Sequence, residues 1–120
     1  EGLSDRVDGL LRDRCIDLIG MARRAGQAVA GYEKVCGYLR GGKADVLLIA
    51  RDAASGGRTK IIRLASGVTV VNTLCSSELS QVFARTRVVY AAIGLRSLAE
   101  RLVLEADRLA GFRMPIGSGK

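Results

Sequence analysis

Apolar residues recur every three or four positions over residues 5–25, which is the spacing of one face of an α-helix. Arg23 and Arg24 fall in the last turn of this segment, where cations complement the helix dipole. Gly26 follows, and glycine is the usual residue at the left-handed position that ends a helix. The pattern therefore predicts one long amphipathic helix at the start of the chain.

Shorter helical patterns alternate with runs of strand length along the rest of the chain. The predicted helices span about residues 32–40, 58–65, 76–84 and 97–110, and the predicted strands span about residues 27–30, 46–50, 68–71 and 88–93. Residues 46–50 form a continuous apolar run, which is typical of a strand buried on both faces. We expect this strand and the β-branched strand at 68–71 to form the centre of the sheet.

Strict alternation of helices and strands with short connections predicts an α/β fold. The expected architecture is a three-layer α/β/α sandwich, in which helices cover both faces of a central mixed, largely parallel four-stranded sheet. The 120 residues contain no repeat or linker, so a single domain is expected over residues 1–112, followed by a flexible C-terminal tail at 113–120. A chain that begins at Glu1 rather than Met is expected to be a piece of a longer protein.

The chain is basic, and its charge is unevenly distributed. Nineteen Lys and Arg against twelve Asp and Glu give a net charge of +7, and there is no histidine. Residues 1–20 carry three basic and five acidic side chains, whereas residues 21–120 carry sixteen and seven, so the net charges are −2 and +9. Such a basic body suits a polyanionic partner such as nucleic acid, although solubility also explains a moderate charge.

The three cysteines, Cys15, Cys36 and Cys75, lie far apart in apolar surroundings and lack C-x-x-C spacing. We expect reduced thiols in the core, which is typical of the cytoplasm. A cysteine nucleophile is the alternative, but a chain without histidine cannot form a Cys-His pair or a zinc site that uses histidine. We therefore expect no metal.

No catalytic or cofactor-binding motif is present. No G-x-G-x-x-G sequence follows a predicted strand, so no dinucleotide cofactor is expected. Gly56 and Gly57 precede a predicted helix and could offer amides to a phosphate, or could form a solvated loop. The acidic residues lie in different segments with no spacing that pairs them for catalysis. No apolar run is long enough to predict a membrane-spanning helix.

Several short motifs between residues 19 and 52 resemble one family. They are A-R-R-A-G at residues 22–26, a glycine before the second helix at Gly31, G-K-A at 42–44, and I-A-x-D at 49–52. Over about residues 7–110 the chain resembles the kink-turn-binding ribosomal-protein family (the L-seven-Ae/L-thirty-e group), most closely its small bacterial RNA-binding members. The resemblance implies a non-catalytic, ribosomal protein-like fold that binds structured RNA, either kink-turn-like or ribosomal.

The resemblance also implies where RNA would bind. Members of this family bind RNA with the turn into the second helix and with the loop before the last strand, which correspond to residues 30–34 and 83–88. The family's strict kink-turn readers carry Lys-Gly-x-Asn-Glu at the first place, whereas this chain has Ala30, Glu33 and Lys34 at the Lys, Asn and Glu positions. The mapping puts both segments at one end of the domain, where they would bind one RNA together.

The residues at the first segment also suit RNA by their own chemistry. Gly31 would let an RNA backbone approach closely, and the free amides at the start of a helix favour a phosphate. Tyr32 can stack on an unpaired base, and Lys34 can pair with a phosphate. Glu33 can accept hydrogen bonds from a guanine edge, but it equally suits the positive end of a helix dipole.

The arginines have two interpretations each. Arg23 and Arg24 can contact RNA or can simply stabilise the end of the first helix. Arg85 and Arg87 flank a loop and can bind RNA or only solvate that loop. The candidate RNA-binding residues are therefore Arg23, Arg24, Gly31, Tyr32, Glu33, Lys34, Arg85 and Arg87.

Two functions of other classes stay open. Similar domains serve as substrate-RNA-binding modules of larger RNA-modifying enzymes such as ribosomal-RNA methyltransferases, whose catalytic domain would lie elsewhere. Related folds also serve as protein-interaction adaptors, but those tend to be acidic, and the charge of +7 argues against that role. Neither the oligomeric state nor the identity of the RNA follows from the sequence.

Overall fold

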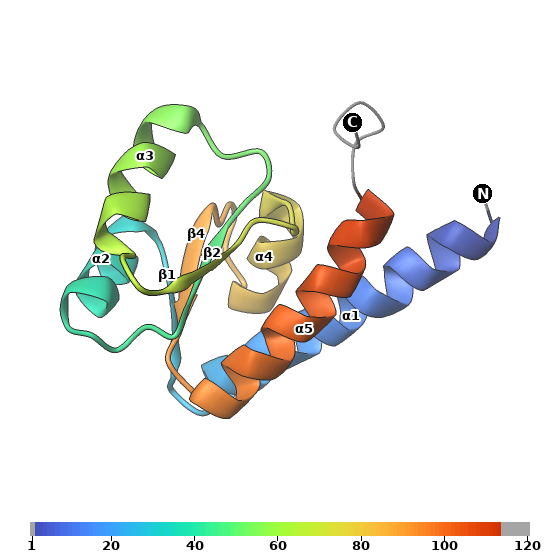
Figure 1. Cartoon of the computed structure of the whole chain (residues 1–120), viewed down its shortest axis with the longest axis horizontal. Coiled ribbons are helices and arrows are strands. Elements are labelled where there is room, and N and C mark those ends of the chain that lie inside the picture. Colours follow the sequence, from blue (N-terminus) through green and yellow to red (C-terminus); the bar gives the residue numbers. More distant parts are fainter. Residues whose placement is uncertain (1, 114–120) are drawn as a thin grey trace.

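The computed structural model describes residues 2–113, with side chains from residue 7 onward (Figure 1). This part of the chain forms five helices and four strands, which alternate as the sequence predicts. They are α1 (Gly2–Arg24), β1 (Ala28–Ala30), α2 (Tyr32–Arg40), β2 (Val46–Ile49), α3 (Ser55–Leu64), β3 (Thr69–Val71), α4 (Ser76–Phe83), β4 (Tyr90–Ile93) and α5 (Arg96–Arg113). Among these residues no helix is both long and apolar enough to cross a membrane.

The strands form one mixed sheet in the order β1-β4-β2-β3. Strand β4 is antiparallel to both β1 and β2, and only β2 and β3 are parallel neighbours. The prediction of a largely parallel sheet is therefore wrong, because most of the pairing is antiparallel. After β3 the chain passes through α4 and re-enters the sheet at the end where β3 leaves it, so β4 runs against its neighbours. Alternation of helices and strands predicts the elements, but the direction of each strand depends on contacts between distant residues.

Of the two strands predicted at the centre of the sheet, β2 lies there and β3 does not. Strands β2 and β4 occupy the centre, and all their residues are buried. Strand β3 lies at the edge instead, where Thr69 is exposed and Val70 keeps 38% of its surface accessible. The β-branched run at 68–71 favours a strand but carries no information about which strands flank it, so its central placement is wrong.

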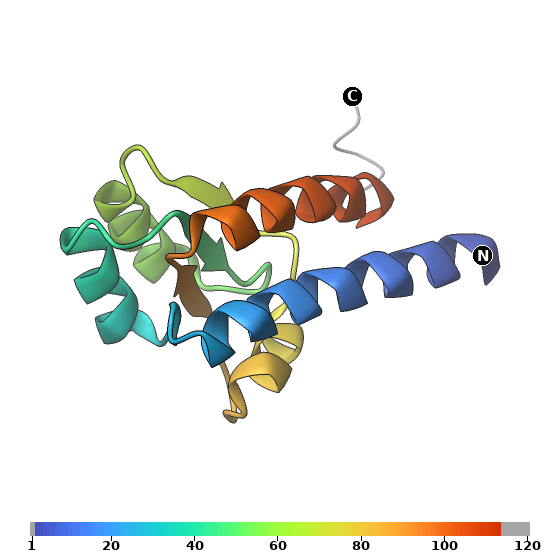
Figure 2. The same cartoon turned by 90° about the horizontal axis from the view of Figure 1, so that it is seen from below.

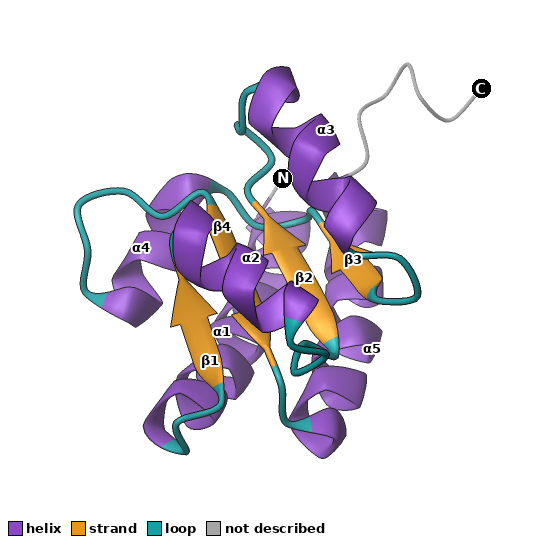
Figure 3. Ribbon diagram, turned by 90° about the vertical axis from the view of Figure 1, so that its left-hand side faces the viewer, coloured by secondary structure: helices purple, strands orange, loops and turns teal. Residues whose placement is uncertain are grey.

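Helices cover both faces of the sheet (Figure 3). Along β2, Val46 and Leu48 pack into the core beneath α1, α4 and α5, while Leu47 and Ile49 pack into a second core beneath α2 and α3. This alternation follows from the two-residue period of a strand, and a strand with apolar residues on both faces is buried between two layers. The three layers of the predicted sandwich are thus present, around a sheet of different topology.

The cysteine prediction holds for two of the three thiols. Cys15 is fully buried in the core beneath α1, and Cys36 is buried in the core beneath α2. Burial, with a smaller contribution from the charge of Glu105, raises the pKa of the Cys15 thiol to about 12. Cys75 differs from the prediction because it lies half-buried just before α4, outside the apolar core.

Figures 1 and 2 show α1 and α5 side by side and running in opposite directions. Arg113, at the end of α5, links this helix to α1 and α4. Its guanidinium donates to both carboxylate oxygens of Asp8 in α1 at 2.9 and 3.0 Å, and to both of Glu78 in α4 at 2.9 and 2.8 Å. The sequence assigned Arg113 to the tail, but it is the last residue of α5, with only 12% of its side chain exposed. The remainder of the predicted tail, residues 114–120, lies outside the described residues.

The Arg113 cluster shifts the ionisation of its members. Hydrogen bonds from Arg113 lower the pKa of Asp8. Burial opposes ionisation of Glu78, but hydrogen bonds from Arg113 and from the backbone of Cys75 outweigh it and also lower its pKa. Both carboxylates therefore add stability above their ordinary pKa of about 4, and this stability is lost as the pH falls further.

Replacing Arg113 should reveal this contribution. Removing one partner of a buried ion pair costs about 3–5 kcal/mol, and partial exposure reduces the expected loss for Arg113→Gln to about 2–3 kcal/mol. Urea unfolding at pH 7 measures it. At pH 3 the difference between wild type and variant should shrink, because the contribution of Asp8 and Glu78 declines once the pH falls below their ordinary pKa. Arg108→Gln should change stability by less than about 0.5 kcal/mol, because the guanidinium of Arg108 is largely exposed and lies 3.7 Å from Glu105. Equal stability of the Arg113 variant and wild type at pH 7 would contradict the assignment.

Candidate nucleic-acid interface

The turn into α2 is built on Gly31. Its N–H donates to the carbonyl oxygen of Tyr90 at 2.9 Å, and its own carbonyl accepts from the N–H of Val35 at 2.9 Å. Gly31 has φ 99° and ψ 146°, a region that residues with a side chain rarely adopt. A Cβ at this position would also lie 3.0 Å from Nη1 of Arg85. The glycine is therefore required by the backbone and by the arginine seated against it, whatever approaches from outside.

Arg85 joins the two segments that the sequence mapped to RNA. Its Nη1 donates to the carbonyl oxygen of Ala30 at 3.2 Å, which ties the loop between α4 and β4 to the end of β1. The loop itself is held by Ser80, whose hydroxyl oxygen accepts from the N–H of Val88 at 2.8 Å. The predicted juxtaposition of residues 30–34 and 83–88 at one end of the sheet is thus present in the structure.

A surface pocket of about 200 Å³ lies where these segments meet the end of α1. Arg23, Lys34 and Arg85 line it, together with Phe83 and the three residues of β1. Nη1 of Arg23 donates to the carbonyl oxygen of Val82 at 3.1 Å, which holds this side chain toward α4. Three of the eight candidate residues therefore converge on one pocket from three different elements.

Gly31, Tyr32 and Glu33 lie beside this pocket at the start of α2. The ring of Tyr32 packs edge-on against Tyr90, with ring centroids 5.7 Å apart and planes at 70°. It still keeps 36% of its surface exposed. Glu33 is exposed in the first turn of α2, where its charge also suits the helix dipole.

Arg24 and Arg87 do not join the pocket. The guanidinium of Arg24 lies back along α1 over Gly20. Arg87 extends toward Asp52, with Nη1 3.9 Å from Oδ2, and both side chains are largely exposed. The carboxylate of Asp52 also accepts from the N–H and the hydroxyl of Ser76, at 2.9 and 2.6 Å, which caps α4 and lowers the pKa of Asp52.

Ala30 and Phe83 fall within the mapped segments without being candidate residues, and the sequence missed Ala28 and Val29 because only the order of the strands makes β1 an edge. The sequence placed Gly57 ahead of the third predicted helix, as a source of amides for a phosphate or as part of a solvated loop, but it lies in the first turn of α3. A Cβ there would lie 2.7 Å from the hydroxyl oxygen of Tyr90, so this close approach accounts for the glycine. Within residues 7–113, no three His, Cys, Asp or Glu side chains are grouped so that they could hold a metal.

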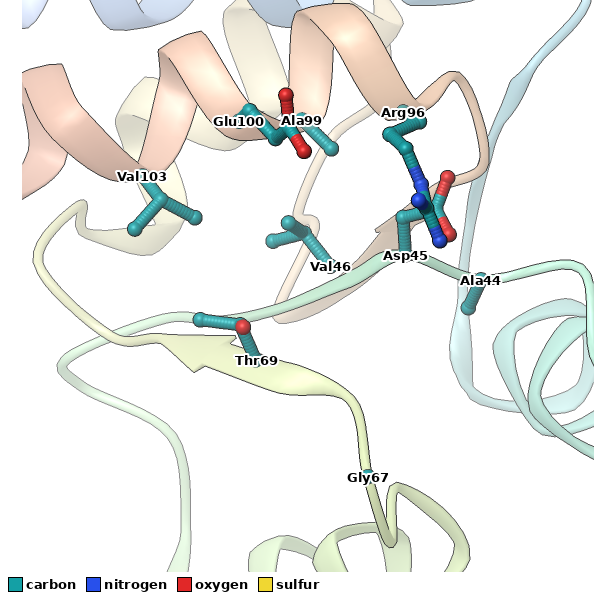
Figure 4. Close-up of a pocket in the computed structure, with 9 residues that line it drawn as sticks. All are labelled: Ala44, Asp45, Val46, Gly67, Thr69, Arg96, Ala99, Glu100 and Val103. Carbon is teal, nitrogen blue, oxygen red and sulfur yellow. The ribbon is translucent and has the colours of Figure 1, made fainter.

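A larger pocket, of about 360 Å³, lies at the opposite end of the sheet between α5 and the edge strand β3 (Figure 4). Its lining mixes the cation of Arg96 with the carboxylates of Asp45 and Glu100. Anions are therefore opposed there by two negative charges. The pocket of Arg23, Lys34 and Arg85 has no acidic residue in its lining and is the more suitable place for a polyanion.

Comparison with known proteins yields relatives at low identity. No protein-family model matches the chain. An RNA-binding protein, YlxQ, from Enterococcus faecium is 27% identical over 84 residues, which cover 68% of this chain and 82% of that protein. A protein of unknown function from Bacillus halodurans has a similar structure, with a TM-score of 0.67 and 21% identity over 78% of this chain and 96% of that one. The 15.5kD RNA binding protein of Giardia lamblia has a TM-score of 0.63 and 16% identity, covering 85% of this chain and 89% of that one. The structural likenesses establish a shared fold.

The conformation of Gly31 leads to a test of stability. Gly31→Ala should destabilise the domain by about 1–3 kcal/mol, because the new Cβ occupies a strained backbone region and crowds Arg85. Gly37→Ala is the matched control within the same helix, since a Cβ at Gly37 meets nothing within 4 Å and alanine favours a helix by about 0.5–1 kcal/mol. Chemical denaturation of both variants measures the difference. If Gly31→Ala were as stable as Gly37→Ala, the positive φ at Gly31 would be wrong.

Proposed function

We propose that this chain is a non-catalytic RNA-binding protein of the kink-turn-binding ribosomal-protein group. It binds structured RNA, kink-turn-like or ribosomal, with the end of the domain that carries residues 30–34 and 83–88. The observation that carries the proposal is the hydrogen bond from Arg85 to Ala30, because it joins two segments distant in sequence so that Arg85 and Lys34 line one pocket. The name of the Enterococcus relative, the shared fold and the net charge of +7 support the same function. The cysteine usage supports a cytoplasmic setting.

Each side chain at this end has a role in the proposed complex. The amides at the start of α2 and the ammonium of Lys34 receive phosphates, since both present positive charge at a helix N-terminus. The exposed part of the Tyr32 ring stacks on an unpaired base, and Glu33 accepts hydrogen bonds from a guanine edge. Arg87 reaches a more distant phosphate from the other side of the loop. Because Ala30, Glu33 and Lys34 replace the Lys, Asn and Glu of strict kink-turn readers, binding depends more on phosphates than on base edges.

Removing single charges tests the two-segment interface. Lys34→Ala and Arg87→Ala should each weaken binding by about 1–3 kcal/mol, since each removes a charge-assisted contact. The measurement is titration of a kink-turn hairpin RNA with each folded variant at one salt concentration, with the unkinked duplex as a second probe. Arg101→Ala, on the exposed side of α5, is the control and should change little. Equal losses for all three variants would mean diffuse attraction rather than this interface.

The salt dependence tests the physical basis of binding. Each phosphate neutralised by the protein releases counterions, so log K should fall linearly with log salt by about 0.7–0.9 per contact. Several contacts are expected from the +9 carried by residues 21–120. Titration of the same RNA at four or five salt concentrations gives the slope. Binding that does not respond to salt, or no binding to any structured RNA at low salt, would contradict the proposed function.

A further inference from the structure

The pocket of about 200 Å³ at the edge of β1 concentrates positive charge without compensation. Arg23 comes from the end of α1, Lys34 from the first turn of α2 and Arg85 from the loop before β4. The remaining lining is apolar, from Phe83 and from the alanines and valine of β1, with no carboxylate among the lining residues. Three cations that share a pocket repel one another, and this repulsion is relieved when an anion enters.

The two arginines are fixed in place before any ligand arrives. Arg23 uses Nη1 to donate to the carbonyl oxygen of Val82, and Arg85 uses Nη1 to donate to that of Ala30. A guanidinium carries five N–H donors in a rigid plane, so each arginine keeps most of its donors after this anchoring bond. Anchored guanidiniums lose less side-chain freedom on binding than solvated ones, which favours a specific anion contact.

The edge of β1 that pairs with no other strand adds a backbone donor to the same pocket. The N–H of Gly31 donates to Tyr90, and the N–H of Gly94 donates to Gln27. Residues 27, 29 and 31 therefore direct their backbone groups toward β4 in the antiparallel ladder. Hydrogen-bonding direction alternates along such a strand, which turns the N–H and C=O of Ala30 outward. The bond from Arg85 to the carbonyl of Ala30 agrees with this direction. The N–H of Ala30 therefore points outward on the side of β1 where Arg85 lies.

We infer that this pocket holds one phosphate of the RNA backbone, so that a strand of the bound RNA crosses the free edge of β1. The inference rests on the proposed function and adds Arg23 and the edge of β1 to the contacts of residues 30–34 and 83–88. Pockets for drug-sized ligands span about 300–1,000 Å³, so the smaller volume here suits a phosphate rather than a whole nucleotide. Arg23, Lys34 and the N–H of Ala30 contact its oxygens, and Arg85 closes the pocket from the loop.

Coupling between two of the cations tests whether they share one phosphate. Arg23→Gln and Lys34→Gln should each weaken binding of the kink-turn hairpin about tenfold, and the double variant should lose clearly less than the hundredfold product, because groups in one contact network are not additive. Arg40→Gln is the matched control, since Arg40 also ends a helix and is exposed but lies outside the pocket. Independent losses that multiply would mean two separate phosphates. Single variants that bind RNA as Arg40→Gln does would overturn the inference while leaving RNA binding intact.

A second measurement examines the pocket without RNA. Inorganic phosphate at millimolar concentration should shift the backbone amide resonance of Ala30 in an ¹⁵N correlation spectrum, and the double variant should show no such shift. The kink-turn hairpin should shift the same amide and displace phosphate from it. No response of Ala30 to either probe would overturn the site. A response to phosphate in a protein that binds no RNA would keep the anion site, and would reject both RNA as its source and the proposed function.

Discussion

The reversed direction of β4 at the centre of the sheet determines where the interface can form. Because β4 runs against β1 and β2, it begins at the end of the sheet where β1 finishes. The loop before β4 is thereby brought beside the turn into α2, and Arg85 can reach the carbonyl of Ala30. The same arrangement lets Tyr90 accept from the N–H of Gly31, which fixes the first turn of α2. A parallel β4 would begin at the other end and leave the two segments apart.

The helices and strands could be predicted from the sequence, but which strands lie side by side could not. Periodicity reports whether a residue faces a core, and all nine elements could be predicted from it. Strand order depends on contacts between distant residues, to which local pattern is insensitive. The valine-rich strand at 68–71 is therefore predicted at the centre of the sheet, although it lies at the edge. Ala91 and Ala92 lie in the buried strand β4, but alanine favours a strand less than valine does. The sequence named Gly31 as a candidate for RNA binding, and only the structure shows its positive φ and the guanidinium of Arg85 beside it.

Two groups of basic residues can be distinguished, those paired inside the protein and those directed to the pocket. Arg113 is committed to Asp8 and Glu78 inside the protein, where it holds together α1, α4 and α5. Arg23, Lys34 and Arg85 converge on a pocket that has no acidic residue in its lining. The sequence placed Arg113 in a tail because the predicted last helix ends near residue 110, and it could group the three pocket cations only through the family resemblance. Net charge alone therefore cannot indicate which basic residues are available to a partner.

The position of β4 also has a consequence for how the protein is made. Strand β1 forms its ladder with a strand some sixty residues later, and α1 packs against α5 at the far end of the chain. Contacts between such distant residues slow folding, because a long loop must close before they add stability. During synthesis, α1 and β1 leave the ribosome long before their partners exist. Until β4 has been translated, Arg85 cannot be held against the carbonyl of Ala30 and the pocket beside β1 is not formed. A nascent chain therefore cannot engage RNA through this surface.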